Sequence, residues 1–311
     1  MSAIRIGVDI GGTKIEAAVV RGESEVLWRE RVATPQGEYD ATVEAVATLV
    51  ARAVHDVTTK HALATQLPVG LGAPGSISPR TGLQRNSNSI CLNGRPFRED
   101  LARALQRPVR MANDANCFAL AEAVAGAARG ARCVFGVILG TGVGGGVVID
   151  RVAHEGRNAV GGEFGHGQQQ GLALEALREQ RTHEPRACYC GQVDCREQYI
   201  AGSAIEREFT QRTQRVLKLI EIEAAAHAGD RDASAAIARW AERVAASLGD
   251  VINLLDPDCI VLGGGASNLR AAIDVVAPRV AHYTFGDCCT TPIVRAELGD
   301  SAGVIGAAWL W

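Results

Sequence analysis

Aromatic residues, methionine and unbroken apolar runs are all scarce in this chain of 311 residues. Aromatics make up 5% of the sequence, methionine occurs 2 times and glycine 35 times. The core must therefore be built from Val, Ile, Leu and Ala, with many tight turns. The longest apolar stretch, residues 134–149, is broken by six glycines and is shorter than the roughly 20 residues of a membrane-spanning helix. This stretch is therefore not expected to cross a bilayer.

The sequence also lacks a targeting segment and a dominant charge. Its first residues, MSAIRIGVDI, have no basic region, no long apolar region and no small-residue cleavage site, so we expect a cytoplasmic protein. A net charge of -3 and a pI near 6.2 argue against a nucleic acid or an anionic membrane as the partner. In a reducing compartment, the 9 cysteines indicate buried thiols or metal ligands before disulfides.

The spacing of apolar residues predicts an α/β protein with the same plan in both halves. Each half opens with a strand, a glycine turn and a second strand. Further strands are predicted at 26–34, 67–72, 109–112, 260–262 and 292–297, and helices at 43–57, 98–106, 117–128, 237–255 and 268–281, with a loop over 76–97. Length and alternation predict two domains, 1–116 and 117–301, and a final helix at 302–311 that returns to the first.

Residues 9–14, Asp-Ile-Gly-Gly-Thr-Lys, lie between two predicted strands and have the composition of an anion-binding turn. Glycines let backbone N–H groups converge, while a hydroxyl and a lysine add a donor and a positive charge. Asp9 can hold Mg²⁺ directly or through water. A plain hairpin with a surface lysine is the alternative. The predicted nucleotide ligands here are Asp9, Gly11, Gly12, Thr13 and Lys14.

A second glycine segment, residues 140–146, matches G-x-G-x-x-G. A dinucleotide site needs a helix directly after such glycines, but a strand is predicted here, and a G-x-x-x-x-G-K-[ST] P-loop is absent. Two strand–glycine–strand turns favour a nucleotide clamped between related domains. We predict contacts from Gly140, Thr141, Gly142 and Gly144, and from Gly264 and Gly265 of a third glycine cluster, for which a plain strand-to-helix turn is the alternative.

Five segments in series resemble the ROK family of repressors, open reading frames and sugar kinases: DIGGTK (9–14), ANDANC (112–117), LGTGVGGG (139–146), GGEFGH (161–166) and CYCGQVDCRE (188–197). The resemblance covers residues 4–311 in the family's order and spacing. It implies the actin-like ATPase (ribonuclease H-like) fold, with two related domains around a nucleotide and sugar cleft. Residues 86–97 and 299–311 look most like the fructokinase/mannokinase branch, with the N-acetylglucosamine kinases as near neighbours. Repressor members carry an N-terminal helix-turn-helix domain, for which the few residues before Asp9 leave no room.

The resemblance implies roles for polar residues of these segments. Asp114 aligns with the family's catalytic base, which accepts the proton of the sugar hydroxyl as the bond to phosphorus forms. From its sequence position alone, between a strand and a helix, an N-cap is an equal alternative. The implied sugar ligands, besides Asp114, are Asn88, Asn113, Glu163, His166 and Glu197, whose carboxylate and amide groups suit vicinal hydroxyls.

The cysteines of residues 188–197 predict a metal site. Cys188, Cys190 and Cys195, with the family's His166, supply three thiolates and one imidazole, the composition of a closed structural zinc site. Buried free thiols or a redox pair are the alternatives. The chain departs from the family at two places: Asp194 stands where relatives usually have glycine, and residues 168–170 are glutamines where relatives are more apolar.

Together these features predict a kinase that uses ATP, Mg²⁺ and a structural Zn²⁺ and phosphorylates the 6-hydroxyl of a hexose. Fructose, mannose or glucose is the expected substrate. An N-acetylglucosamine or N-acetylmannosamine kinase and a non-catalytic sugar sensor are the alternatives. The resemblance admits a homodimer, and no nucleic acid or membrane partner is expected.

Overall fold

The computed structural model describes residues 3–61, 66–180 and 182–311 and divides into two compact units. Unit 1 consists of Met1–Arg132, Gly146–Gly162 and Glu297–Trp311, and unit 2 of Cys133–Gly145 and Glu163–Ala296. Residues 117–132, 146–162 and 297–301, predicted to belong to the second domain, group with unit 1.

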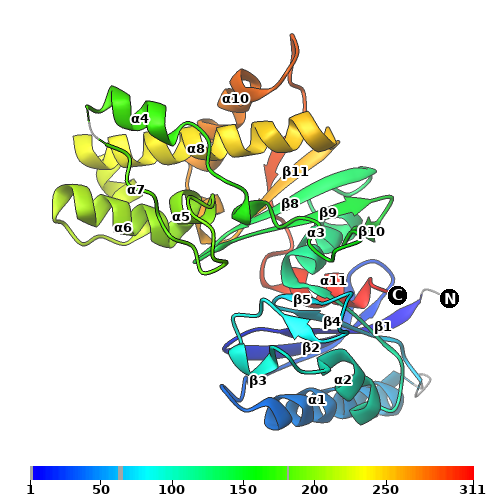
Figure 1. Ribbon diagram of the computed structural model, residues 1–311. Coiled ribbons are helices and arrows are strands. Elements are labelled where there is room, and N and C mark those ends of the chain that lie inside the picture. Colours follow the sequence, from blue (N-terminus) through cyan, green and yellow to red (C-terminus); the bar gives the residue numbers. More distant parts are fainter. Residues whose placement is uncertain (1–2, 62–65, 181) are drawn as a thin grey trace. The chain divides into compact units, whose positions relative to one another are not determined.

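Unit 1 is built on a five-stranded sheet with the order β3-β2-β1-β4-β7. Its strands are β1 (Ile4–Ile10), β2 (Lys14–Arg21), β3 (Glu25–Ala33), β4 (Val69–Ala73) and β7 (Val109–Asn113). Helices α1 (Tyr39–His61) and α2 (Phe97–Ala104) cover one face, and α3 (Asp114–Ala125) and α11 (Ala302–Ala308) cover the other (Figure 1). Both faces are covered, so β2 and β4 are buried almost throughout rather than alternating.

Helix α11 packs unusually close to the sheet and to α3 because glycines face it. A Cβ on Gly7 of β1 would lie 1.8 Å from the Val304 carbonyl oxygen, and one on Gly70 of β4 would lie 1.8 Å from that of Ala307. Gly306 of α11 similarly faces the Cys117 carbonyl of α3, where a Cβ would lie at 1.7 Å. No side chain fits at these three positions, so the C-terminal helix is built into unit 1.

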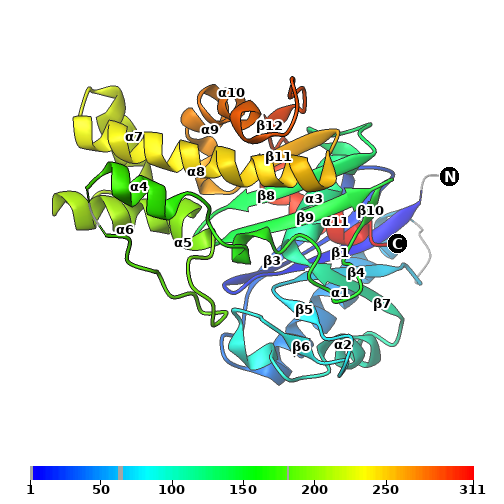
Figure 2. The ribbon, with the colours of Figure 1, turned by 45° about the horizontal axis from the view of Figure 1, so that its top comes forward.

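Unit 2 contains most of a second five-stranded sheet, with the order β10-β9-β8-β11-β12. Its strands are β8 (Cys133–Leu139), β9 (Val143–Ile149), β10 (Val152–Ala153), β11 (Cys259–Gly263) and β12 (Ile293–Arg295), and the unit boundary falls inside β9. The long helix α8 (Arg231–Leu255) carries the predicted apolar stripe, including the fully buried Trp240 and Leu248. Around it pack α6 (Gly202–Thr213), α7 (Leu219–His227) and α10 (Val276–Val280) (Figure 2).

Several elements differ from the prediction. The predicted loop 76–97 contains the hairpin β5 (Ser76–Ile77) and β6 (Gln84–Arg85) and the 3-10 turn η1 (Ile90–Leu92). The predicted helix 268–281 is broken into η3 (Gly265–Asn268), α9 (Ala271–Asp274) and α10. Helix α9 ends at Asp274, whose carbonyl would need a hydrogen bond from residue 278, and Pro278 cannot donate one. Helix α3 begins at Asp114 rather than at residue 117.

The region between β9 and α6 holds elements that the apolar pattern did not reveal. These are η2 (Phe164–His166), α4 (Leu172–Arg178) and α5 (Glu197–Ile200). Short 3-10 turns also occur at η4 (Ala281–Tyr283) and η5 (Gly299–Ser301). None of the helices in the described residues combines the length and apolar character needed to cross a membrane.

Candidate active site and metal centre

In unit 1, two predicted site carboxylates lie at one edge of the sheet. Strands β1, β4 and β7 are parallel, and their register pairs Asp9 with Gly72 and Ala73 with Asn113. The carboxyl ends of the three strands therefore meet at one edge, which brings Asp9 near Asp114, the residue after β7. A Cβ on the intervening Gly72 would lie 3.7 Å from Asp9 Oδ1. Two carboxylates at one edge can hold a divalent cation or exchange a proton.

Asp9 is held in an environment that disfavours its charge. Burial, and then the negative charges of Asp114 and Glu16, raise the pKa of Asp9 to about 6. Gly303 of α11 closes the site from the other side, since a Cβ there would lie 2.4 Å from Asp9 Oδ2. Asp9 is thus ionised at neutral pH at a cost in stability, an arrangement typical of functional carboxylates.

Replacing Asp9 by Asn should stabilise the metal-free protein at neutral pH. A pKa of about 6 in the folded state, against 3.8 as the ordinary value, corresponds to at most about 3 kcal/mol. Because the folded pKa is the higher one, ionised Asp9 destabilises the protein above pH 6, and protonation relieves this as the pH falls towards 4. Urea unfolding at pH 7.5 should show the variant to be more stable, and the difference should vanish near pH 4. Equal stability at pH 7.5 would contradict the electrostatic interpretation.

Asn113, rather than Asp114, is the N-cap of α3. The Asn113 side-chain oxygen accepts a hydrogen bond from Ala115 N at 2.9 Å, and its Nδ2 donates to the Gly75 carbonyl at 3.1 Å. The alternative role of Asp114 is therefore held by its neighbour. Asp114 lies in the first turn of the helix, is exposed, and also accepts from Ala115 N, at 2.8 Å. Asn113 has one amide hydrogen left for a substrate.

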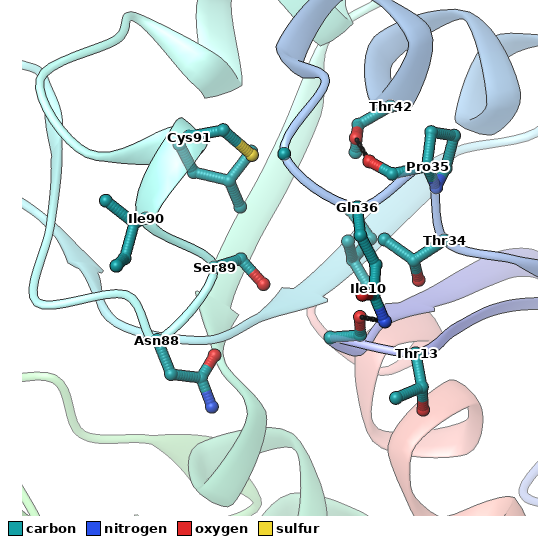
Figure 3. A pocket seen from close by; sticks show the side chains of 13 residues that line it. Ile10, Thr13, Thr34, Pro35, Gln36, Thr42, Asn88, Ser89, Ile90 and Cys91 are labelled. Carbon is teal, nitrogen blue, oxygen red and sulfur yellow. Dashed lines mark hydrogen bonds between the residues drawn. The ribbon is translucent and has the colours of Figure 1, made fainter.

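Gly12 and Thr13 of the 9–14 hairpin and Asn88 line one pocket of about 480 Å³ within unit 1, whereas Asp9 and Gly11 do not line it (Figure 3). Gly12 and Thr13 form one wall, residues 34–37 a second, and Asn88 with η1 a third. The hairpin carbonyls are turned to the second wall: Thr34 Oγ1 donates to Gly11 O at 2.7 Å and Gln36 Nε2 to Gly12 O at 3.4 Å. The predicted phosphate turn and one predicted sugar ligand therefore share a pocket.

Lys14 is not among the residues that line this pocket. Its Nζ lies 3.9 Å from Asp300 Oδ2, in the η5 turn before α11. Arg31 approaches the same carboxylate oxygen at 3.3 Å. All three side chains are substantially exposed, so the contacts are weak. An arriving phosphate would compete with Asp300 for Lys14.

In unit 2, the glycine turn is shorter than predicted. Only residues 140–142 form the turn, because Gly144 already belongs to β9. The turn is braced from α6, where Gly202 N donates to Gly140 O at 2.9 Å and Ser203 Oγ donates to Thr141 O at 2.6 Å.

The third glycine cluster adjoins this turn. Gly264 has a φ of 81°, and a Cβ there would lie 2.6 Å from the Leu139 carbonyl group. Only glycine satisfies both the left-handed backbone and this close approach. A Cβ on Gly265 would meet nothing within 4 Å, so its backbone borders open space. Residues 140–142 and 264–265 thus form one glycine-rich surface in unit 2.

Glu197 joins the glycine turn to the cysteine cluster. Its Oε2 accepts a hydrogen bond from Val143 N at 3.2 Å, and the Cys188 thiol lies 3.8 Å from its Oε1. Glu163 directly precedes η2, which ends at His166, so both are carried by the same turn. Three of the predicted sugar ligands therefore lie around the cysteine cluster within unit 2.

The four predicted metal ligands converge. One donor atom from each of His166, Cys188, Cys190 and Cys195 lies within 4.8 Å of the others. His166 Nδ1 is 3.6 Å from Cys188 Sγ, and the Cys190 and Cys195 sulfurs are 3.5 Å apart. A tetrahedral ion with bonds of about 2.3 Å to sulfur places its sulfur ligands roughly 3.8 Å apart. The residues therefore fit a tetrahedral metal ion.

The thiols of this cluster have little tendency to ionise together. Burial, followed by the neighbouring thiols of Cys190 and Cys188, raises the pKa of Cys195 to about 12. Burial also raises the pKa of Cys188. A bound cation is the means by which such closely packed thiolates can coexist.

Asp194 replaces a family glycine and yet adopts the backbone that glycine favours. Its φ is 57°, in the left-handed region. Its carboxylate accepts three hydrogen bonds, from Arg186 N at 2.9 Å, Tyr199 OH at 2.5 Å and His183 Nε2 at 2.8 Å. Burial opposes ionisation, but these donors hold the pKa of Asp194 below its usual range. The hydrogen bonds of the Asp194 carboxylate thus stabilise a left-handed turn that glycine would adopt without strain.

The glutamine run attaches the same loop to α8. Gln169 is buried, its Oε1 accepts from Ser247 Oγ at 3.2 Å, and its backbone N donates to Asp194 O at 2.8 Å. Gln170 Nε2 lies 3.0 Å from both carboxylate oxygens of Asp250. Asp194 and the glutamines, at which the chain departs from the family pattern, therefore hold the cysteine loop together through polar contacts.

Replacing Asp194 by Ala should destabilise unit 2 by about 2–4 kcal/mol, because hydrogen bonds to a charged group contribute about 1.5–3 kcal/mol each and are not additive. Asp194→Gly loses the same hydrogen bonds but is relieved of the left-handed backbone, which costs other residues about 1–2 kcal/mol. Denaturant unfolding should therefore rank the wild type above Asp194→Gly and that variant above Asp194→Ala. An Asp194→Gly variant as stable as the wild type would show that the carboxylate adds nothing.

Two contacts at the site were missed by sequence reasoning. Asp300, the counter-ion of Lys14, is far from it in sequence and only the return of α11 to unit 1 brings it close. Tyr189 lies between two metal ligands, and its OH is 3.0 Å from His166 Nε2. The position of Tyr189 inside the Cys-x-Cys pair was a usable signal, since its backbone must follow the two cysteines.

The two five-stranded sheets have equivalent strand orders, each with three consecutive strands at one edge followed by two later strands, as in the actin-like ATPase fold. The sequence profile of the ROK family matches residues 5–311. The chain therefore belongs to the ROK family, and its fold is the actin-like ATPase fold, as predicted.

Curated relatives and solved structures agree along the whole chain. N-acetyl-D-glucosamine kinases of Escherichia fergusonii and of Shigella flexneri serotype 5b are 37% and 38% identical over 305 residues, 98% of each chain. A ROK hexokinase from Thermus thermophilus matches with a TM-score of 0.83 and 32% identity, covering 99% of this chain and 97% of that one. A ROK glucokinase from Streptomyces griseus, solved with glucose and AMPPNP, matches with a TM-score of 0.74 and 29% identity, covering 98% of both.

These similarities make the chain a sugar kinase of the ROK family. The curated relatives named above are N-acetylglucosamine kinases. They do not confirm the fructokinase/mannokinase branch that residues 86–97 and 299–311 suggested.

Proposed function

We propose that this protein transfers the γ-phosphoryl group of ATP to the 6-hydroxyl of a hexose, with Asp114 as the general base. The observation that carries this proposal is the exposed Asp114 carboxylate at the sheet edge beside Asp9, with the N-cap role already held by Asn113. An exposed carboxylate in a helix's first turn can accept a proton from an incoming hydroxyl. The neighbouring Asp9 would bind Mg²⁺ directly or through water.

Both units carry groups of the kinds that this proposal needs. The 9–14 hairpin and the glycine surface of residues 140–142 and 264–265 offer backbone N–H groups for the phosphates and the nucleoside. Asn88 and Asn113 of unit 1, and Glu163, His166 and Glu197 of unit 2, would hydrogen-bond the sugar hydroxyls.

The Cys₃His cluster would hold Zn²⁺ in a structural role. Three thiolates and one imidazole leave no open coordination position on a tetrahedral ion. The ion would fix the loop that carries His166 and Glu197 and would not touch the reacting atoms. His166 would serve both the metal, through Nδ1, and the sugar side, through Nε2.

Two hexose classes have specific support. The similarity to N-acetylglucosamine kinases over 98% of the chain favours N-acetylglucosamine. The segments 86–97 and 299–311 favour fructose or mannose. Asn88 belongs to the first of these segments and lines the unit 1 pocket, so this pocket is the place where the two classes would be distinguished.

A coupled assay of ADP release tests the proposal. ATP and Mg²⁺ should be supplied with N-acetylglucosamine, N-acetylmannosamine, glucose, mannose and fructose in turn. We expect ADP release only with a hexose present, and a 6-phosphate product by NMR. Hexose binding by calorimetry without ADP release would instead indicate the sugar sensor, and ADP release without any hexose would indicate a different ATPase.

A further inference from the structure

Tyr189 contacts His166, one of the unit 2 residues that the proposed function assigns to the sugar. Its hydroxyl is 3.0 Å from His166 Nε2, and the two rings meet edge to face with centroids 5.1 Å apart and an interplanar angle of 86°. Its side chain remains 74% exposed, so the ring borders solvent rather than the core. Because Cys188 and Cys190 flank Tyr189, its backbone belongs to the loop that carries the cysteine ligands.

The geometry determines the direction of the hydrogen bond between Tyr189 and His166. His166 Nδ1 faces the cysteine sulfurs, at 3.6 Å from Cys188 Sγ. An imidazole that ligates a metal through Nδ1 keeps its proton on Nε2. Nε2 must then donate, and the Tyr189 oxygen accepts, sharing this one hydrogen in a bifurcated bond with any sugar oxygen that His166 also contacts. The hydroxyl hydrogen of Tyr189 is consequently directed away from His166 and can be donated to another group.

The neighbouring residues of the proposed sugar site are Glu163, His166 and Glu197. Glu163 directly precedes the η2 turn that ends at His166, and Glu197 Oε1 lies 3.8 Å from the thiol of Cys188, the residue before Tyr189. These three residues offer acceptors and one imidazole, so a phenol donor complements them for a polyol.

We propose that Tyr189 is a further substrate-binding residue, which donates its hydroxyl hydrogen to a sugar oxygen and lays its exposed ring against the hexose. The inference rests on the proposed hexose site of Glu163, His166 and Glu197. His166 and Tyr189 act as a pair: the metal orients the imidazole, the imidazole orients the phenol, and the phenol contacts the sugar. The aromatic ring supplies the apolar surface that the carboxylates and imidazole of this site lack.

The test compares Tyr189→Phe with wild type, using the hexose of highest kcat/KM. Phe keeps the ring but lacks the donor, so the KM for hexose should rise about tenfold, the equivalent of about 1.4 kcal/mol. The KM for ATP and the bound metal per chain should stay at their wild-type values. Tyr189→Ala also removes the ring and should raise the KM for hexose further. Tyr283→Phe is the matched control, since it loses a hydroxyl that donates to Glu242.

Each outcome decides the proposal. An unchanged hexose KM in Tyr189→Phe, with metal retained, would overturn it, and so would a loss of metal that accounts for the whole effect. Calorimetric binding of the same hexose separates this inference from the proposed function. If wild type binds the hexose without turnover, the kinase mechanism fails, and a tenfold weaker Kd in Tyr189→Phe still supports Tyr189. If wild type binds none of the five hexoses, both fail.

Discussion

Replacing Asp114 by asparagine should lower kcat by about 10²–10⁴-fold, the usual contribution of a general base. Asparagine has the same shape and can still accept the hydrogen bond from Ala115 N, but it cannot take a proton from the sugar hydroxyl. The fold should persist, because the N-cap of α3 is Asn113. Since the charge of Asp114 helps to raise the pKa of Asp9, the variant should also be slightly more stable at neutral pH.

The measurement is steady-state ADP release at saturating ATP and hexose, together with denaturant unfolding of both proteins. Asp40→Asn is a matched control, because Asp40 also lies in the first turn of a helix and its side chain is 96% exposed. This control should retain wild-type kcat. Turnover by Asp114→Asn within a few-fold of the wild type would remove Asp114 from the role of base and leave the chemistry to another group.

Replacing Cys195 by serine should abolish tight metal binding and lower the free energy of unfolding by on the order of 3–5 kcal/mol. Cys195 is fully buried, and its sulfur lies 3.5 Å from both Cys190 Sγ and the His166 carbonyl. A serine hydroxyl is a poor soft-metal ligand and leaves an incomplete coordination set. Kinase activity should fall when the metal is lost, because the same loop carries Glu197.

The zinc content is measured by mass spectrometry, and the Tm is measured by thermal unfolding with and without a chelator. Wild type should contain about one zinc per chain, and chelation should lower its Tm to near that of the variant. Cys259→Ser is the control: Cys259 is 5% exposed in β11, outside the cluster. It should keep its metal and its response to the chelator. Wild-type protein without zinc, or with a Tm that a chelator does not change, would contradict the structural metal site.

The sequence predicted the parts of the site that local pattern encodes. The DIGGTK hairpin forms between β1 and β2, as its flanking apolar runs and paired glycines indicated. The Cys-x-Cys pair, Cys195 and His166 converge, because three thiols and an imidazole at family spacing leave few other arrangements. The stripe of α8 is buried where its spacing of apolar residues placed it.

Other features depended on contacts between residues far apart in sequence. The glycine turn 140–142 is shorter than its glycines suggested, because Gly144 and its neighbours continue the sheet as β9. Even within the cysteine loop, the contacts with His183, Arg186 and Tyr199 that hold the Asp194 carboxylate, and its left-handed backbone, could not be predicted from the sequence. Asp300 carries no local signal of its contact with Lys14, and the place of Tyr189 inside the Cys-x-Cys pair indicates its loop but not its contact with His166.

By itself, the sequence determined the family and the two-fold α/β plan, and it predicted the phosphate turns, the base and the metal ligands. These follow from short-range rules of strand period, glycine turns and ligand spacing. Only the tertiary structure decided that Asn113 caps α3 while Asp114 stays exposed, that Asp9 is buried enough to hold its proton up to about pH 6, and that Tyr189 meets His166. The physical reason is that burial, charge and hydrogen-bond partners come from neighbouring elements of the fold.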